Sequence, residues 1–230
     1  MKILAVDTSA KSASVAVTED EKLISESFVN IGLTHSETLM PMIVATLKNA
    51  GTEINDIDRF CVTTGPGSFT GIRIGISAVK GLAQPYNKLC YGVSTLEAMA
   101  YNNEDFDGII CCSMDARRSQ VYCALFSSCN KEIKRLTQDV AISIDELYNE
   151  LKGLNKKILL TGDGAELCFN SFAEKINVCL ASEQTRFQRA YGAVKAVLKQ
   201  NIEPVLPQSL NPVYLRPSQA ERELNNKKEN

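Results

Sequence analysis

Three short segments carry the residue types that bind phosphate oxygens or a cation. Asp7-Thr8-Ser9 ends an apolar strand, Asp115-Ala116-Arg117-Arg118 follows a second expected strand, and Gly162-Asp163-Gly164-Ala165 follows a third. A carboxylate with two hydroxyls at a hairpin tip can hold a hydrated cation or a phosphate, but the same residues also favour ordinary polar turns. The third segment suits either nucleotide contact or a plain strand-to-helix turn. The spacing leaves these alternatives open.

The second of these segments differs from a phosphate-binding turn in one respect. Glycines allow a backbone to approach a bound phosphate closely, whereas this turn carries Arg117 and Arg118. Two arginines at this place would crowd a phosphate site or hold an external acidic partner.

The most distinctive motif is GPGSFTGIRIG, residues 65–75, between an expected strand and an expected helix. Its free backbone N–H groups could bind an anion. It matches neither common phosphate fingerprint, because no Lys-Ser/Thr pair follows the loop and the glycines are not spaced as G-x-G-x-x-G. Gly71, Gly75, Ala78 and Leu82 share one helix face, and a helical glycine costs about 1 kcal/mol relative to alanine. This stripe favours close approach of another backbone, which belongs either to a partner or to the protein's own sheet.

The composition argues against several kinds of catalytic site. His35 is the only histidine, so no site can be built from several imidazoles, and a zinc-hydrolase ligand set is disfavoured. No Ser-His-Asp or Cys-His arrangement can be defended, and no carboxylates are spaced as metal ligands. We therefore expect no catalytic residue and no metal site. His35, at the start of an expected helix, has either a partner contact or a structural role.

Charge and cysteine content favour a cytoplasmic protein that binds nucleic acid weakly on its own. The 230 residues include 25 Lys and Arg against 27 Asp and Glu, a net charge of −2, whereas proteins that grip a phosphate backbone usually carry a basic excess. Most of the eight cysteines lie in apolar runs, which is typical of reduced core thiols. No apolar run approaches the roughly 18 residues of a membrane span. The candidates for a local basic patch are Arg186, Arg189, Lys195 and Lys199.

The order of expected elements restarts halfway along the chain. Three strands followed by alternating helices and strands occur twice, which predicts two related α/β halves. We place them at residues 1–105 and 106–230, with the C-terminal segment able to pack back on the first half. The expected strands are 2–7, 12–18, 22–29, 59–64, 108–114, 120–127, 132–136, 157–161 and 178–180; the expected helices are 36–50, 68–82, 94–101, 143–151, 165–175 and 185–199.

Several motifs together resemble the TsaB (YeaZ) family, which is a paralogue of the TsaD family. They are ILAVDTSAKSASVAV, THSETLMPMI, GPGSFTGIRIGISAVKGLA, the SxLE of Ser94–Glu97, DARRSQVYCALF and PVYLRP, and they cover nearly the whole chain. The resemblance implies the α/β actin/hexokinase/Hsp70-like ATPase fold, in which each of two related halves has a mixed sheet flanked by helices. This agrees with the restart in the expected elements.

The resemblance also implies a role in threonylcarbamoyladenosine modification of tRNA. It implies a non-catalytic scaffold that pairs with the transferase TsaD, works with the ATPase TsaE through that pair, forms a homodimer alone, and meets tRNA only through the complex. No cofactor is expected, apart from weak or vestigial ATP or ADP binding at the partner boundary. The implied partner-interface residues are Leu39, Ile43, Leu47, Gly71, Gly75, Ala78 and Leu82. The implied vestigial phosphate loops contain Asp7, Thr8, Ser9 and Asp115.

The main alternative is an independent small ATPase or phosphotransferase of the same fold. Asp7 and Asp115 would then hold magnesium, and the turn at 162–165 would hold adenosine. Arg117 and Arg118 count against this alternative, as does the lack of a clear catalytic base near either loop. A peptidase is a weaker hypothesis still, because both nucleophile and metal ligands are missing.

Overall fold

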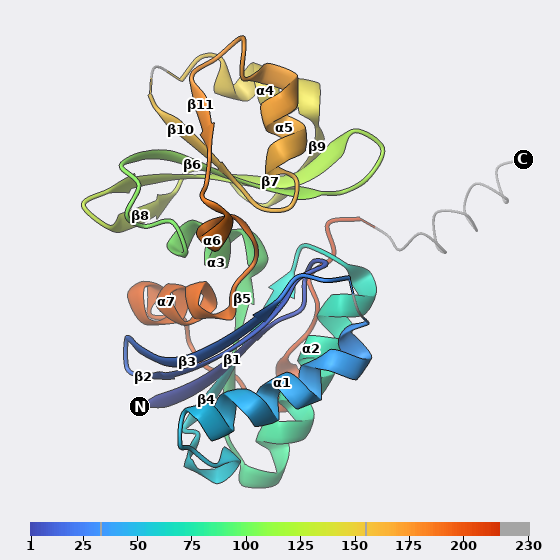
Figure 1. The fold of residues 1–230 in the computed structure, drawn as a ribbon, viewed down its shortest axis with the longest axis vertical. Helices are drawn as coiled ribbons and strands as arrows, with labels where there is room; N and C mark the ends of the chain where they lie inside the picture. Colours follow the sequence, from blue (N-terminus) through green and yellow to red (C-terminus); the bar gives the residue numbers. More distant parts are fainter. Residues whose placement is uncertain (33, 155, 217–230) are drawn as a thin grey trace, which may run out of the picture.

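The computed structural model describes residues 1–32, 34–154 and 156–216 (Figure 1). Its first sheet has the strand order β3-β2-β1-β4-β5. The strands are β1 (Lys2–Asp7), β2 (Ala13–Glu19), β3 (Lys22–Val29), β4 (Arg59–Gly65) and β5 (Leu89–Ser94). The helices of this half are α1 (His35–Asn49), α2 (Phe69–Ala83) and α3 (Thr95–Tyr101). β1 to β3 are antiparallel neighbours, whereas β4 and β5 join the sheet in parallel.

The second sheet repeats this arrangement. Its order β11-β10-β6-β7-β8, read from the other edge, matches the first sheet, with β6 to β8 antiparallel and β10 and β11 parallel. The prediction of two related α/β halves is confirmed. The strands are β6 (Gly108–Asp115), β7 (Gln120–Cys129), β8 (Glu132–Arg135), β9 (Val140–Ser143), β10 (Ile158–Thr161) and β11 (Val178–Leu180). The helices are α4 (Ile144–Leu151), α5 (Ala165–Phe172), α6 (Glu183–Arg186) and α7 (Ala190–Gln200).

The two sheets are separated by helices and also covered by helices on their outer faces (Figure 1). α3 and α7 pack on each other between the sheets, α1 and α2 cover the first sheet, and α4 and α5 cover the second. Successive side chains of β1 point to opposite faces of the first sheet. Ile3 therefore packs in the core between the two sheets, and Leu4 packs in the core under α1 and α2. Cys112 and Cys111 divide in the same way in β6. Within the described residues, no helix is both long and apolar enough to cross a membrane.

After β11 the chain returns to the first half. α7 packs on β1 and β2, and residues 203–216, here called the strap, then run along β5 and α2. Val205 exchanges backbone hydrogen bonds with Cys90 of β5 (2.8 and 2.7 Å), and the Val213 N–H donates to the Thr64 carbonyl (2.8 Å). The C-terminal segment therefore lies against the first half, while the domain boundary near residue 105 stays a prediction.

The sequence analysis did not predict strands β5 and β9, and one helix that it predicted is wrong. β5 carries Gly92 in a short run, which weakens the strand pattern, and β9 is only four residues long. The helix expected over 185–199 is instead α6 and α7, separated by extended backbone at Phe187 and Arg189. The Gln188 side chain between them donates to Asp163 (2.9 Å). This partly buried contact joins the link between α6 and α7 to the turn before α5.

Candidate functional site

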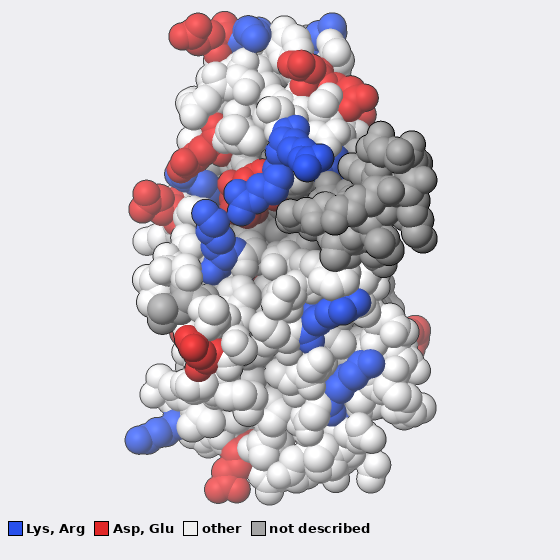
Figure 2. All heavy atoms as spheres, turned by 90° about the vertical axis from the view of Figure 1, so that its right-hand side faces the viewer, with Lys and Arg blue, Asp and Glu red and all other residues white. Residues whose placement is uncertain are grey.

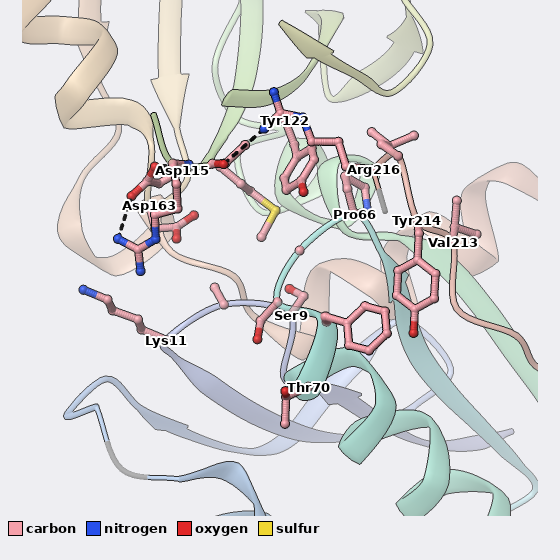
Figure 3. Close-up of a pocket in the computed structure, with 18 residues that line it drawn as sticks. Ser9, Lys11, Pro66, Thr70, Asp115, Tyr122, Asp163, Val213, Tyr214 and Arg216 are labelled. Carbon is pink, nitrogen blue, oxygen red and sulfur yellow. Dashed lines mark hydrogen bonds and ion pairs between the residues drawn. The ribbon is translucent and has the colours of Figure 1, made fainter. Parts of the chain in front are cut away.

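A cleft of about 640 Å³ lies between the two halves, where their equivalent loops face each other (Figure 3). All three segments that the sequence singled out as phosphate or cation binders contribute to its wall. The end of the strap forms another side. The polar and aromatic residues that line it are Ser9, Lys11, Ser68, Phe69, Thr70, Asp115, Arg117, Tyr122, Asp163, Tyr214 and Arg216.

The first loop uses its polar groups inside the protein. Asp7 Oδ1 accepts hydrogen bonds from the Ser9 N–H (2.9 Å) and the Ser9 hydroxyl (2.6 Å). The Thr8 hydroxyl donates to the Gly71 carbonyl (2.8 Å), and the Ser9 carbonyl accepts from the Ser68 N–H (2.7 Å). Both hydroxyls are thus committed to internal acceptors, so the loop has less to offer a phosphate than its sequence indicates.

Asp7 is buried beneath this loop. Its side chain is 1 % exposed, and within the described residues its Oδ2 has no hydrogen-bond partner. Burial raises the pKa of the Asp7 carboxyl above its ordinary value, and the hydrogen bonds from Ser9 oppose that rise. The ionised carboxylate therefore destabilises the fold at neutral pH.

Asp7→Asn should stabilise the isolated protein at pH 7. The amide keeps an acceptor for Ser9, removes the buried charge, and places a donor near the buried Thr63 hydroxyl, which also has no partner among the described residues. Relief of one unsatisfied buried group, about 1–3 kcal/mol, predicts a melting temperature raised by about 2–12 °C. The gain should fade as pH falls through the raised folded pKa, and vanish below about pH 3.9, because Asp7 is then protonated in both states. Thermal melts from pH 3 to 8 measure this; a loss of stability at pH 7 contradicts it.

The second loop keeps the backbone shape of a glycine turn without the glycines. Arg117, Arg118 and Ser119 have φ of 65°, 55° and 56°, and residues other than glycine seldom occupy this left-handed region consecutively. Asp115 holds the turn by accepting from the Arg117 N–H (2.7 Å) and from its guanidinium (3.2 Å). Both arginine side chains are exposed. The turn therefore presents arginines at the cleft where a phosphate loop would present bare backbone.

The third loop presents one carboxyl to the cleft. Asp163 follows β10 and accepts from Gln188, a side chain 1 % exposed. Burial raises the pKa of the Asp163 carboxyl, while the Gln188 hydrogen bond lowers it. No group of three or more His, Cys, Asp or Glu side chains gathers as a metal site in the described part of the chain. The alternative with bound magnesium needs Asp7 and Asp115 as ligands, but Asp115 is bonded to Arg117. The residues present therefore fit a magnesium-nucleotide site poorly.

The strap supplies a side of the cleft that sequence reasoning missed. The Tyr214 ring stacks on Phe69 of α2 with centroids 4.6 Å apart, and its hydroxyl accepts from Arg73 Nε (2.7 Å). Arg216 then reaches across the cleft and donates to the Ala116 carbonyl (3.2 Å). The segment PVYLRP contributed to the family resemblance. Its contacts with the cleft were not predictable, because they join residues far apart in the chain and leave no local sequence pattern.

The glycine face of α2 packs on the protein's own first loop. A Cβ at Gly71 would overlap the Thr8 carbonyl oxygen, and one at Gly75 would lie 2.5 Å from the Thr8 hydroxyl oxygen. These contacts favour the intramolecular alternative for the two glycines over their assignment to a partner contact, which stays a prediction. Their small size serves the intramolecular alternative, in which the helix approaches the end of β1 closely.

The apolar face of α1 is likewise turned inward. Leu39, Ile43 and Leu47 are buried in the cluster between α1, α2 and the first sheet. This burial favours a role in the protein's own core, and their assignment to a partner surface stays a prediction. A helical period shows that residues share a face, but not what the face packs against. Ala78 and Leu82 are only partly buried, and their contact with a partner stays a prediction.

Other apolar side chains form the outward surface of these two helices. Met40 and Val44 of α1 are 44 % and 62 % exposed. Ile74, Ala78 and Leu82 of the adjacent α2 are partly exposed. We call these five residues the outer apolar face. Figure 2 shows that the lower half of the molecule, over α1 and α2, is mostly uncharged.

His35 and the sequence-derived basic patch both have internal partners. His35 Nε2 donates to the Ala10 carbonyl (2.7 Å), which supports a structural role. Each cation of the patch is paired with a carboxylate: Arg186 with Glu166, Arg189 with Glu26, Lys195 with Glu104 and Lys199 with Glu21. These four residues therefore do not form an unpaired basic patch.

The duplicated sheets and the cleft between them define a protein of the actin/hexokinase/Hsp70-like ATPase fold, here with arginines in the second phosphate turn. A family model described as TsaD, tRNA N6-adenosine threonylcarbamoyltransferase, matches residues 31–213. Among curated relatives, the tRNA threonylcarbamoyladenosine biosynthesis protein TsaB of Bacillus subtilis (strain 168) is 32 % identical over 167 residues, 73 % of each chain. The Escherichia coli (strain K12) protein of the same name is 32 % identical over 71 % of this chain and 72 % of its own. The chain belongs to the TsaB family.

A solved structure supports the fold independently. The crystal structure of a Pseudomonas aeruginosa protein described as uncharacterized and similar to peptidase YeaZ superposes with a TM-score of 0.81. It is 23 % identical and covers 94 % of this chain and 99 % of its own. This likeness shows that the whole described fold is shared.

Proposed function

We propose that this chain is the non-catalytic partner subunit in threonylcarbamoyladenosine synthesis on tRNA. In this role it pairs with a TsaD-type transferase and works with a TsaE-type ATPase. The observation that carries the proposal is the TsaB-family match, which extends over 73 % of the chain in the B. subtilis relative. That relative is named for the same biosynthesis.

The cleft geometry supports the non-catalytic part of the proposal. The hydroxyls of Thr8 and Ser9 are bonded internally, and the turn opposite carries Arg117 and Arg118 in place of glycines. Phosphoryl transfer depends on positioned phosphate and metal ligands, and these loops offer few of them. The independent ATPase is therefore the less favoured reading.

The outer apolar face supports the pairing part of the proposal. It consists of exposed aliphatic side chains on two neighbouring helices, and such patches on a soluble protein mark contacts with other proteins. Homodimerisation of the isolated chain through this face belongs to the proposal. So does a cytoplasmic location, which the eight free cysteines support.

Reconstitution tests the proposal directly. The isolated chain should hydrolyse ATP and modify tRNA no faster than a buffer control. Cognate TsaD and TsaE, supplied with ATP and with the AMP adduct of threonylcarbamate as the group donor, should modify tRNA only when this chain is added. The measurements are phosphate release and modified adenosine in digested tRNA. Turnover by the pure chain that is abolished by Asp7→Asn would establish the ATPase instead. Saturating ATP-Mg²⁺ gives a second test, because real binding adds about 2.7 kcal/mol of stability at 100 Kd.

A further inference from the structure

The β6–β7 turn holds exposed arginines in a backbone conformation that favours glycine. The φ values of Arg117 and Arg118 are 65° and 55°. Strained conformations of this kind cluster at functional sites, and here three residues in succession, Arg117 to Ser119, adopt one. Glycine would adopt the same turn without strain, so the turn points to a use for the arginine side chains themselves.

Lys11 faces the same cleft from the opposite half. Lys11, labelled in Figure 3, lines it. Arg117 lines it too, and Arg118 follows directly in the turn. Lys11 and Arg118 are exposed, and neither forms an ion pair with another described residue, whereas Arg117 is paired with Asp115. We call Lys11, Arg117 and Arg118 the cleft-mouth cations. In Figure 2, Lys and Arg side chains follow one another across the middle of the molecule.

The carboxyls of the cleft are already engaged. Asp115 accepts from Arg117, and Asp163 accepts from the buried Gln188. Arg117 offsets the charge of Asp115, and Lys11 and Arg118 remain to attract an incoming anion. The internally bonded hydroxyls of the first loop argue against a small nucleotide as that anion.

We propose that the cleft-mouth cations bind the phosphate backbone of the tRNA. This inference rests on the proposed function, which places a tRNA at the complex. Exposed Lys and Arg side chains are the usual partners of phosphate oxygens and carry no sequence preference. The outer apolar face serves the protein partner in the proposed function. The cleft-mouth cations are a separate surface and are available to bind RNA in the complex. Three such contacts are too few for firm binding by the isolated chain, since phosphate contacts act additively.

The test uses Arg118→Gly in the complex of this chain with cognate TsaD and unmodified tRNA. Arg118 has no ion pair among the described residues, and glycine relieves the left-handed backbone, so the variant should melt no lower than wild type. Binding of tRNA should weaken about fivefold. The slope of log affinity against log salt should fall by about 1. Lys11→Gln should lower both quantities in the same way.

Lys131→Gly is the matched control. Lys131 is also exposed and left-handed, with φ of 66°, in the β7–β8 turn, and its ammonium is paired with Asp105 (2.8 Å). Its replacement removes the same charge and relieves the same kind of strain at another place. It should leave tRNA affinity and the salt slope unchanged.

Three outcomes would contradict the inference or the proposed function on which it rests. Unchanged tRNA binding by both Arg118→Gly and Lys11→Gln overturns the inference. A weaker complex with TsaD, at equal tRNA affinity per complex, also overturns it, because the cations would then serve an acidic protein surface. If the wild-type complex modifies no tRNA, the proposed function fails, and that failure is visible before any variant is made.

Discussion

Gly71→Ala is expected to lower the melting temperature of the isolated chain by about 2–12 °C, from an overpacking cost of about 1–3 kcal/mol. The added methyl group would overlap the Thr8 carbonyl oxygen, which belongs to the backbone and cannot rotate away. α2 would have to move from the end of β1, and the hydrogen bond from Thr8 to the Gly71 carbonyl (2.8 Å) would be strained or lost. Thermal unfolding followed by circular dichroism measures the effect.

Gly81→Ala is the matched control on the same helix. A Cβ at Gly81 meets nothing within 4 Å, and alanine is the better helix former by about 1 kcal/mol. This variant should therefore melt at or above the wild-type temperature. Gly75→Leu should destabilise as Gly71→Ala does, because its Cβ would lie 2.5 Å from the Thr8 hydroxyl oxygen. A Gly75→Leu protein that melts normally but no longer pairs would restore the partner reading of this stripe.

The glycine stripe shows where sequence reasoning about the site reaches its limit. Helical spacing places Gly71 and Gly75 on one face, and their size indicates a close approach. The same pattern results whether the approaching backbone is a partner's or the chain's own. Only the fold shows that the first loop fills this place, because Thr8 lies 63 residues away from Gly71 in the chain.

Other features were predictable because their signals are local. The restart of strand patterns predicted two related halves, and both sheets have the same strand order. Asp7-Thr8-Ser9 and Asp115-Ala116-Arg117-Arg118 were predicted as loops that follow similar strands, and the structure places Ser9 and Asp115 in one cleft. The aromatic stack of Phe69 with Tyr214 could not be predicted, since it joins residues that are far apart in the chain.

Val44→Asp should abolish pairing while leaving the fold intact. Val44 is 62 % exposed, so its replacement removes little from the core. In a complex built on the outer apolar face, the carboxylate would be buried without a partner. A loss of about 2–4 kcal/mol, as at an interface hot spot, corresponds to an affinity about 30- to 1000-fold weaker. Light scattering of the isolated chain and titration with cognate TsaD measure the homodimer and the heterodimer separately.

Asn49→Asp places the same charge on the same helix but outside this face. Asn49 is exposed, and five residues along a helix turn it well away from the direction of Val44. The control should pair normally and support tRNA modification, whereas Val44→Asp should support neither. If Val44→Asp pairs with TsaD at wild-type affinity, the partner binds elsewhere on the molecule. If it loses only the homodimer, the two assemblies use different surfaces, because a shared apolar face would transmit the buried charge to both.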